Sequence, residues 1–183
     1  MRRSLLKTNA TVANLEVAVA KKMVMNRGYY LSKLKLMTET ISIQAAAPSD
    51  YPAVCELLSK HKLPIEDINQ ELDHFFIVKQ YGLPIGVIGM ELYGEYGLLR
   101  SMATDPVHRN NGIASSLIVE LFSYGKSLGL KEMYLLTETA ENYFAKRGFQ
   151  KINREETPPA IKQSAEFSHL CPSTAVVMKK EIQ

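Results

Sequence analysis

The amino-acid sequence predicts an α/β fold with a mixed, mostly antiparallel central sheet of about six to seven strands and helices on both faces. Two observations predict it. Short apolar or alternating runs, separated by turn residues, recur from about residue 41 onward, and one long amphipathic segment beginning near residue 113 joins two of them. Runs joined by tight turns pair antiparallel, whereas a strand, a helix and a second strand in that order form a parallel crossover.

The predicted elements begin with one strand and two helices. Residues 41–44 alternate as a short strand does, and Ser49 with Asp50 is suited to cap a helix over 51–62. A proline then ends that helix, and a second helical stretch is expected over 65–72. We expect these two helices to form one wall of a substrate site.

Three further strands are expected as two hairpins. The apolar runs 75–79 and 85–92 flank the turn "YGLP", and the turn "YGEYG" leads into a third run over 98–103. The dipeptide Asp105-Pro106 closes this third run. These strands therefore supply the antiparallel part of the sheet.

Helices and strands alternate in the rest of the chain. In the helix that begins at 113, apolar residues recur at helical spacing, so one face of it is buried. These residues are Ile113, Leu117, Ile118, Leu121, Phe122 and Leu128. The remaining expected elements are a strand over 133–137, a helix over 140–149, a strand over 150–153, a short helix over 158–164 and a closing strand over 174–178.

Composition excludes several classes of protein. A chain of 183 residues, 46% of them hydrophobic, is long enough for one domain with its own core, and no apolar run approaches the length that crosses a bilayer. The two cysteines, Cys55 and Cys171, lie far apart, and neither they nor the four histidines have the spacing of metal ligands. We expect no metal, no membrane partner and a cytoplasmic location.

Positive charge is concentrated at the N-terminus. Residues 1–36 hold eight of the 22 Lys and Arg residues and one of the 19 acidic residues, so 14 basic and 18 acidic residues remain from Met37 onward. We interpret 1–36 as a poorly ordered basic extension, or as the product of a false start upstream of Met37, and 37–183 as the domain. A targeting peptide is the alternative. A nucleic-acid partner would depend on the extension alone and is not expected; truncation to Met37 is expected to leave stability and activity nearly intact.

The stretch "DPVHRNNGIASSLIVELF", residues 105–122, combines a turn, a small flexible loop and a helix start. The first N–H groups of a helix lack internal partners and carry a partial positive charge, so such a start attracts anions. Gly112 lets a ligand approach the backbone closely. The stretch lacks the Lys-Ser/Thr of a P-loop and the three glycines of a dinucleotide-binding fingerprint.

The segment "RNNGIA", Arg109 to Ala114, resembles the Arg/Gln-x-x-Gly-x-Gly/Ala signature of the GNAT N-acetyltransferases. Two further blocks fit that family: "MATDP" before the loop, and "MYLLT" with "AENYFAKRGF" after the helix. The resemblance covers about residues 41–180 and implies the GNAT fold, with acetyl-CoA as co-substrate and backbone amides of the loop on its pyrophosphate. The implied acetyl-CoA-binding residues are Met102, Ala103, Thr104, Arg109, Asn110, Asn111, Gly112, Ile113, Ala114 and Ser115.

Two residues are candidates for proton transfer. Glu91 lies in the run 85–92, one strand earlier than the strand that leads into the motif. Alternation there points its carboxylate to one face, and a buried carboxylate can deprotonate an amine. An ordinary solvent-facing strand glutamate is the alternative, with Glu138, Glu95 or an ordered water as other bases. In many GNAT enzymes a tyrosine four residues before the glycine of Gly-Phe acts as the general acid. Here Phe144 occupies that position. Tyr143, one position earlier, is the candidate acid, with a packing role as the alternative.

Arg100 is a charged residue inside an apolar strand. Its guanidinium can bind a substrate carboxylate, or it can form a structural ion pair, with Glu91 for instance. Together, "LLRSMATDPVHRNNGIASSLI", "YLLTETAENYFAKRGF" and "PPAIKQSAEFSHLCPSTAVVM" resemble the arsenic-resistance N-acetyltransferases, relatives of phosphinothricin acetyltransferases and of the acetyltransferase domain of N-acetylglutamate synthase. The resemblance implies direct acetylation of the α-amine of a small amino-acid-like substrate, by a monomer or homodimer. A silent acyl-CoA-binding sensor module, or acetylation of a protein- or RNA-associated amine, is the alternative.

Overall fold

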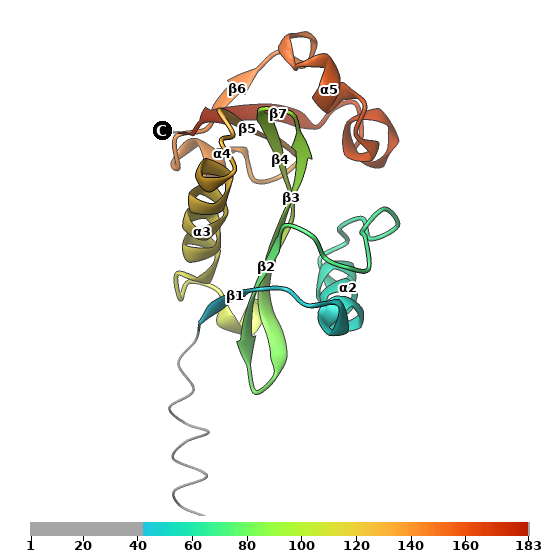
Figure 1. The fold of residues 1–183 in the computed structure, drawn as a ribbon. Coiled ribbons are helices and arrows are strands. Elements are labelled where there is room, and N and C mark those ends of the chain that lie inside the picture. Colours follow the sequence, from blue (N-terminus) through green and yellow to red (C-terminus); the bar gives the residue numbers. More distant parts are fainter. Residues whose placement is uncertain (1–41, 183) are drawn as a thin grey trace, which may run out of the picture. The chain divides into compact units, whose positions relative to one another are not determined.

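The computed structural model describes residues 42–182, and a seven-stranded sheet runs through them in the order β1-β2-β3-β4-β5-β7-β6 (Figure 1). The strands are β1 Ile43–Ala45, β2 Phe75–Gln80, β3 Leu83–Tyr93, β4 Tyr96–Thr104, β5 Glu132–Thr137, β6 Gln150–Ile152 and β7 Val176–Glu181. The α-helices are α2 Tyr51–Lys60, α3 Ile113–Ser127, α4 Glu141–Ala145 and α5 Pro159–Lys162. The predicted α/β fold class is confirmed. The predicted extension over 1–36 lies outside the described residues.

Strand order follows from the connections. Tight turns join β2 to β3 and β3 to β4, and these neighbours pair antiparallel. The connection from β4 to β5 passes through α3, and these two strands pair in parallel, as the crossover predicts. β7 pairs antiparallel with both β5 and β6, which closes the sheet on its second side.

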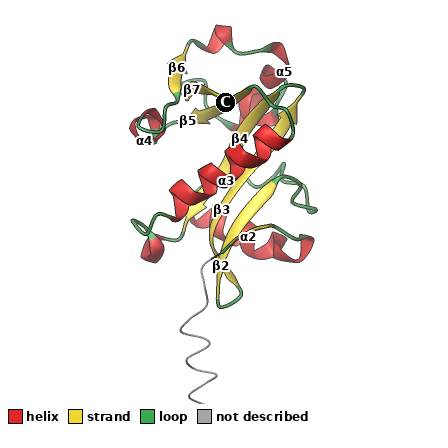
Figure 2. Cartoon of the chain, turned by 60° about the vertical axis from the view of Figure 1, so that its left-hand side comes forward, coloured by secondary structure: helices red, strands yellow, loops and turns green. Residues whose placement is uncertain are grey.

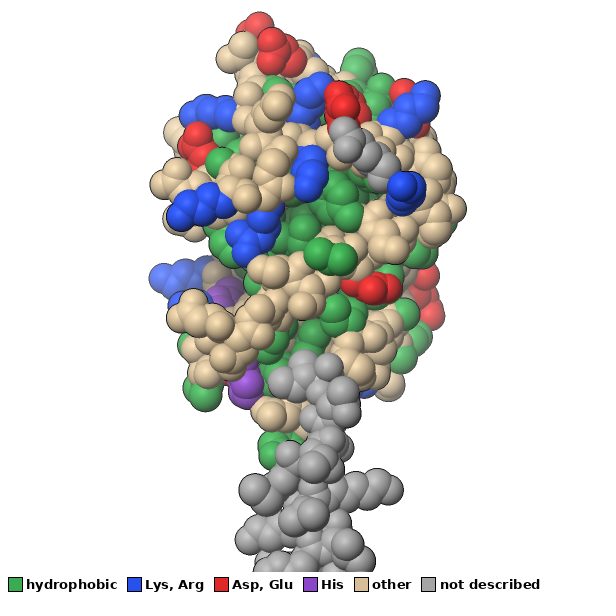
Figure 3. All heavy atoms as spheres, turned by 90° about the vertical axis from the view of Figure 1, so that its left-hand side faces the viewer, with side chains coloured by type: hydrophobic (Ala, Val, Ile, Leu, Met, Phe, Trp, Pro, Cys, Tyr) green, Lys and Arg blue, Asp and Glu red, His purple; other side chains and the backbone are tan. Residues whose placement is uncertain are grey.

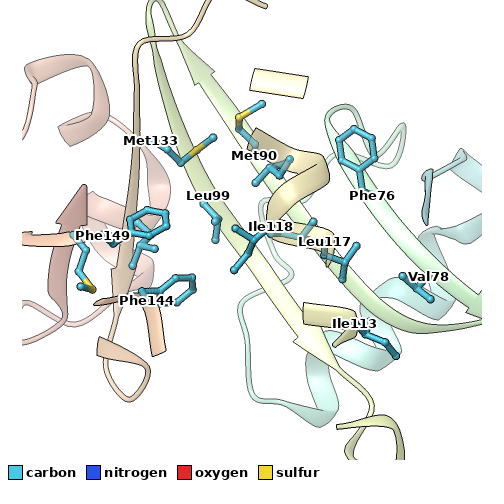
Figure 4. Packing of buried hydrophobic residues seen from close by; sticks show 14 of the residues in the cluster. Phe76, Val78, Met90, Leu99, Ile113, Leu117, Ile118, Met133, Phe144 and Phe149 are labelled. Carbon is cyan, nitrogen blue, oxygen red and sulfur yellow. The ribbon is translucent and has the colours of Figure 1, made fainter. Parts of the chain in front are cut away.

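Helices cover both faces of the sheet. Figures 1 and 2 show α3 on one face and α2 on the other. Under α3, buried side chains of the helix interleave with those of the strands in the core cluster drawn in Figure 4. They include Ile113, Leu117, Ile118 and Leu121 from α3 and Phe76, Val78, Met90, Leu99 and Met133 from the strands. A second cluster lies under α2 and contains Val54, Leu57, Leu58, Ile77 and Val87.

The second helix predicted after α2 is wrong, because residues 65–72 form turns. Asn69 supplies the physical reason, since its side chain competes for local backbone groups. Its Oδ1 accepts a hydrogen bond from the Glu71 N–H at 3.0 Å, and its Nδ2 donates to Asp73 at 3.1 Å. Leu72 has a φ of 53°, outside the helical region. In this part of the chain only residues 61–64 line the large cavity beside β4, so the predicted wall of two helices is not part of that lining.

Two other predicted details also differ. Leu128 is the C-cap of α3 and is 43% exposed, so it does not belong to the buried face. Asp50 is the N-cap of α2, but its side chain makes no capping bond to that helix. Its carboxylate accepts instead from the Ala47 N–H at 3.0 Å and pairs with Lys79 at 2.6 Å. Asp50 therefore ties the helix entry to β2.

None of the helices within 42–182 is long and apolar enough to cross a membrane. No group of three or more His, Cys, Asp and Glu side chains in that range could hold a metal ion. Three acidic side chains do gather within this range, but they surround the guanidinium of Arg100.

Candidate active site

A cleft opens where β4 and β5 part. The two strands pair from Tyr96–Leu98 to Glu132–Tyr134, but β4 continues to Thr104 and β5 to Thr137 without further pairing between them. A cavity of about 1040 Å³ occupies this position. Its lining comes from the free ends of β4 and β5, from the start of α3, from α4, from residues 61–64 and from the segment between α5 and β7.

The loop before α3 is shaped for close approach to its backbone. Gly112 caps the helix with a φ of 79°, and Asn110 has a φ of 64°. A Cβ added at Gly112 would meet nothing within 4 Å, so the space beside it is open. Because the N–H groups of the first turn have no internal partner, the helix presents them at the cleft. The structure thus brings Arg109, Asn110, Gly112, Ile113, Ala114 and Ser115 to the cavity wall.

The start of α3 is held rigidly against β3. Gly86 of β3 approaches it so closely that an added Cβ would lie 2.6 Å from the Ile113 side chain. The loop that precedes α3 is tied to β2 through His108. Its Nδ1 lies 3.3 Å from Asp105 Oδ1 and its Nε2 lies 2.7 Å from Gln80 Oε1. Asp105 Oδ1 also accepts a hydrogen bond from the Val107 N–H at 2.9 Å. The helix terminus is therefore fixed before any ligand arrives.

Cations surround the loop, and one of them was not predicted from the sequence. Arg147 follows α4 and donates to Ser115 Oγ at 2.7 Å and to the Tyr143 carbonyl at 2.9 Å, with its guanidinium 3.5 Å from the centre of the Tyr143 ring. Arg109 lies 3.4 Å from the His61 ring nitrogen. Figure 3 shows Lys and Arg side chains gathered on the upper part of the face that carries α3 and α4. The sequence pattern does not predict a role for Arg147, because Ser115, which it contacts, lies 32 residues earlier in the chain.

Several polar side-chain atoms that line the cleft are buried without a partner. Within residues 42–182 these include the hydroxyls of Thr104 and Tyr143 and the Nε2 of His61. A buried polar group without a hydrogen bond is costly, so such atoms indicate where a ligand is to bind. Phe144 packs into the core, and its ring meets the Tyr143 ring edge-on at 5.3 Å. The candidate acid Tyr143 therefore does lie at the cleft; its role stays a prediction.

A β-bulge in β4 shapes the floor of the cleft. Val87 of β3 pairs with Ala103 and Gly89 with Arg100, so Ser101 and Met102 together face a single residue of β3. Ser101 has a φ of 54°, a strained conformation for a residue other than glycine. The bulge turns the end of β4 away from regular pairing, and its residues from Arg100 to Thr104 all line the cavity.

Arg100 is surrounded by three carboxylates. Its two terminal nitrogens donate to both oxygens of Asp67, at 2.6 and 2.5 Å, and one of them also binds Glu91. Its Nε donates to Ser101 Oγ at 3.2 Å and lies 3.5 Å from Glu166. The side chain is only 2% exposed. The predicted ion pair with Glu91 is confirmed, whereas the predicted contact with a substrate carboxylate stays a prediction.

The cluster of Arg100, Asp67, Glu91 and Glu166 has a surplus of negative charge, which we call the anionic cluster. Burial acts to raise the pKa of Asp67, but the hydrogen bonds and charge of Arg100 outweigh it and the pKa is lowered. Glu166 behaves differently. Its burial, helped by the charges of Glu91 and Asp67, raises its pKa to about 7 against the opposing charge of Arg100.

Other groups near the cleft have defined partners. Glu91 binds Arg100 through one oxygen and accepts from the Tyr93 hydroxyl through the other, and it is not part of the cavity lining. Of the other candidate bases, Glu138 lines the cavity and Glu95 pairs with Lys131 at 2.5 Å. Burial, with the charges of Glu166 and Glu138, raises the pKa of Cys171 to about 11. That thiol is therefore protonated at neutral pH.

Comparison with known proteins gives consistent results. The chain is 31% identical over 97 residues to an amino-acid acetyltransferase of Pseudomonas paraeruginosa, a match that covers 52% of this chain and 22% of that protein. It therefore spans about a fifth of the length of such curated relatives. N-acetylglutamate synthase from Neisseria gonorrhoeae, solved with coenzyme A and N-acetyl-glutamate, matches with a TM-score of 0.68 and 18% identity, over 79% of this chain and 35% of that one.

A Mycobacterium tuberculosis protein solved with CoA and NLQ matches with a TM-score of 0.66 and 22% identity, over 78% of this chain and 99% of that one. At these identities the solved structures establish the fold. A family model described as the Acetyltransferase (GNAT) family matches residues 42–151, more than half of the chain. That match includes the bulged strand β4, the loop at Gly112 and the whole of α3. The chain belongs to the Acetyltransferase (GNAT) family.

Proposed function

We propose that this protein transfers the acetyl group of acetyl-CoA to the α-amine of an amino acid or a close analogue, by direct attack. The observation that carries the proposal is the cleft between β4 and β5, which joins the anion-attracting start of α3 to the anionic cluster. One end suits a phosphate group and the other suits an ammonium group. Family membership and the names of the curated relatives support the same activity.

The residues present fit acetyl-CoA. The backbone amides at the start of α3, from Gly112 to Ser115, with Arg109 and Arg147, would hold its phosphates; Asn111, predicted from the sequence, is not part of the cavity lining. The unpaired edge of β4 at Met102–Thr104 would hold its extended arm by backbone hydrogen bonds. When bound, acetyl-CoA supplies a thioester, which is an activated acyl group.

The chain's own residues orient the reactants and move protons. Backbone amides of the bulged part of β4 near Met102, which lines the cavity, would polarise a carbonyl bound in the cleft. The hydroxyl of Tyr143 is buried at the cleft without a partner, and it would donate a proton to the departing sulfur. The anionic cluster attracts the protonated amine. For Arg100 to bind the substrate's carboxylate as well, that carboxylate would have to replace Asp67.

We further propose that the substrate is an amino-acid analogue of the kind that arsenic-resistance N-acetyltransferases modify, and that the enzyme acts in the cytoplasm. The sequence resemblance supports this substrate class. Among the described residues, Cys171 is the one cysteine in the cavity lining, whereas tight trivalent arsenic sites use more than one thiol, so an arsenic atom would be part of the substrate rather than a ligand of the protein.

A two-part experiment tests the proposal. Calorimetry measures the affinity for CoA, and release of free thiol from acetyl-CoA is followed with the twenty common L-amino acids, L-phosphinothricin and an arsenic-containing glutamate analogue. We expect tight CoA binding and saturable thiol release with at least one panel member. Tight binding without release across the panel would instead support a sensor module, and absence of CoA binding would overturn both functions. Loss of activity on deletion of residues 1–36 would indicate a protein- or RNA-associated amine.

Arg147 gives a prediction about CoA affinity. Arg147→Ala is expected to weaken CoA binding by about tenfold, because it removes one of the cations at the phosphate end of the cleft. The loss should shrink as salt is raised, since Arg147 is only half-buried and screening weakens the contribution of a partly exposed charge. Lys146→Ala is the matched control: Lys146 precedes Arg147 but is exposed and outside the cleft. Equal losses in both variants would show that Arg147 contributes only to net charge.

A further inference from the structure

Glu166 has a position in the cleft that the sequence did not single out. It begins η4, a single π-helical turn over Glu166–Leu170 in the segment between α5 and β7. Figure 1 shows this segment on the same side of the strands as α2. The Glu166 side chain is buried, with 6% of the residue exposed, and it lines the cavity. A carboxylate placed this way reaches the cleft while bulk water is kept from it.

The immediate surroundings of Glu166 leave its carboxylate available. Its charged neighbour is Arg100, whose Nε lies 3.5 Å from Oε1, and that nitrogen already donates to Ser101 Oγ at 3.2 Å. Asp67 takes the shorter, two-pronged contacts with Arg100. The other ionisable groups around Glu166 and the neighbouring Cys171 thiol are Glu91 on β3, Asp67 after α2, Glu138 after β5 and Arg154 before α5.

Glu91 is built differently. Both of its oxygens are engaged, one by Arg100 and one by the Tyr93 hydroxyl, and the residue does not line the cavity. A group that must take a proton from a substrate needs a free oxygen within hydrogen-bond reach of it. Among the three carboxylates of the anionic cluster, Glu166 alone lines the cavity.

We propose that Glu166 is the catalytic residue that accepts a proton from the substrate's ammonium group, and that Glu91 is a positioning residue that acts through Arg100. This rests on the proposed acetyl transfer. An N–H bond of the ammonium breaks and an O–H bond forms on Glu166, which frees the nitrogen lone pair. That lone pair forms the amide C–N bond as the thioester C–S bond breaks and its electron pair leaves with sulfur. The second proton from nitrogen ends on the thiol, and the proton on Glu166 returns to solvent.

The proposal is supported by the ionisation of this carboxyl, because burial raises the pKa of Glu166 to about 7. A base with such a pKa is well matched to work at neutral pH. Above pH 7 the carboxylate is ionised and can deprotonate the ammonium. Below pH 7 it is protonated and cannot, so wild-type kcat/KM for the amine should fall about tenfold for each pH unit below 7 and level off above it.

The test compares Glu166→Gln with wild type, using acetyl-CoA and the panel amino acid with the highest kcat/KM. Gln cannot accept the proton, so kcat should fall about 100-fold at pH 7 while the CoA dissociation constant is unchanged. The variant then depends on free amine in solution. The ratio of wild-type to variant kcat/KM should therefore be constant below pH 7 and shrink about tenfold per pH unit up to the pKa of the amine, roughly 8 or above.

Two control variants separate a catalytic role from a structural one. Glu166→Asp keeps a carboxylate and should recover part of the lost kcat. Glu91→Gln should lower kcat less than tenfold and keep both limbs of the pH profile, with the break at a lower pH because the Glu91 charge no longer raises the pKa of Glu166. The assignment would be overturned if the pH profile of Glu166→Gln runs parallel to that of wild type at every pH. It would also be overturned if the ratio of wild-type to variant kcat/KM falls with rising pH for Glu91→Gln instead of for Glu166→Gln. The proposed function fails separately, if wild type releases no thiol with any panel member.

Discussion

Replacing Gly112 with aspartate will lower the affinity for CoA at least about 100-fold and leave the fold intact. The added side chain has room, since an added Cβ meets nothing within 4 Å, and Asp tolerates the left-handed conformation better than most residues. Its carboxylate would sit at the start of α3 and neutralise the site that attracts the phosphates. Two charges about 4 Å apart near a protein surface repel by about 4 kcal/mol, and each step of about 1.4 kcal/mol is a tenfold loss of affinity, so a loss of about 100-fold or more follows.

Gly112→Asn is the matched control. It has the same size and the same backbone strain as the aspartate variant but no charge, so any difference between the two reports electrostatics at the helix start. Calorimetric titration with CoA measures both affinities, and circular dichroism checks the fold. If the aspartate and asparagine variants bind CoA equally well, the phosphates bind elsewhere and the assignment of this loop is wrong.

Replacing Arg100 with methionine will lower the free energy of unfolding by about 3–5 kcal/mol at neutral pH, the range for breaking a buried ion pair. Methionine occupies a comparable volume, so the loss comes from charge rather than from a cavity. Without the guanidinium, Asp67, Glu91 and Glu166 face one another with no cation between them. Urea unfolding at pH 8 measures the loss.

The loss should shrink when the same measurement is made at pH 5. The pKa of Asp67 is lowered in the folded protein, so its pairing stabilises the fold above its unfolded pKa of 3.8 and is lost only as pH falls below that value; it is still present at pH 5. The pKa of Glu166 is raised from 4.5 to about 7, so its ionised form destabilises the fold as pH rises through that window. Removing Arg100 strengthens the second effect, and protonation relieves it.

Arg100→Lys keeps one positive charge but not the planar pair of donors that binds both oxygens of Asp67. Its loss of stability should therefore be smaller than that of Arg100→Met and should depend less on pH. A methionine variant as stable as wild type at pH 8 would show that the carboxylates are solvated and that the ion pairs contribute little. A loss that is the same at pH 5 and pH 8 would show that packing, not charge, is responsible.

The sequence predicted what local pattern determines. The helical spacing of Ile113 and Leu117 predicted a buried face, and the turn residues predicted both hairpins. The loop at Gly112 was predictable because its small residues and the helix start are adjacent in the chain. A buried ion-pair or binding role for Arg100 was predictable for a similar reason, because a charged residue within an apolar strand needs a partner.

Contacts between distant segments could not be predicted in this way. Asp67 meets Arg100 across 33 residues and Arg147 meets Ser115 across 32, and no periodic pattern connects either pair. No motif or spacing in the sequence distinguishes Glu166 from the other glutamates. Its position at the cleft depends on the tertiary fold. The error over 65–72 had a local cause, because the side chain of Asn69 bonds to the backbone and so competes with a helix.

The short parallel pairing of β4 with β5 has a consequence for partial unfolding. It divides the sheet into two blocks, β1–β4 and β5–β7, each built from strands that lie close together in the sequence. Three residue pairs join the blocks directly, so the junction should open at lower free energy than either block unfolds. In hydrogen exchange, the amides of β4 from Leu99 onward and of β5 from Leu135 onward that point toward the cleft, rather than toward β3 or β7, should then be protected less than those of β3. A molecule bound along both free edges would act as a strand between the blocks, and its affinity would appear as slower exchange on both sides at once.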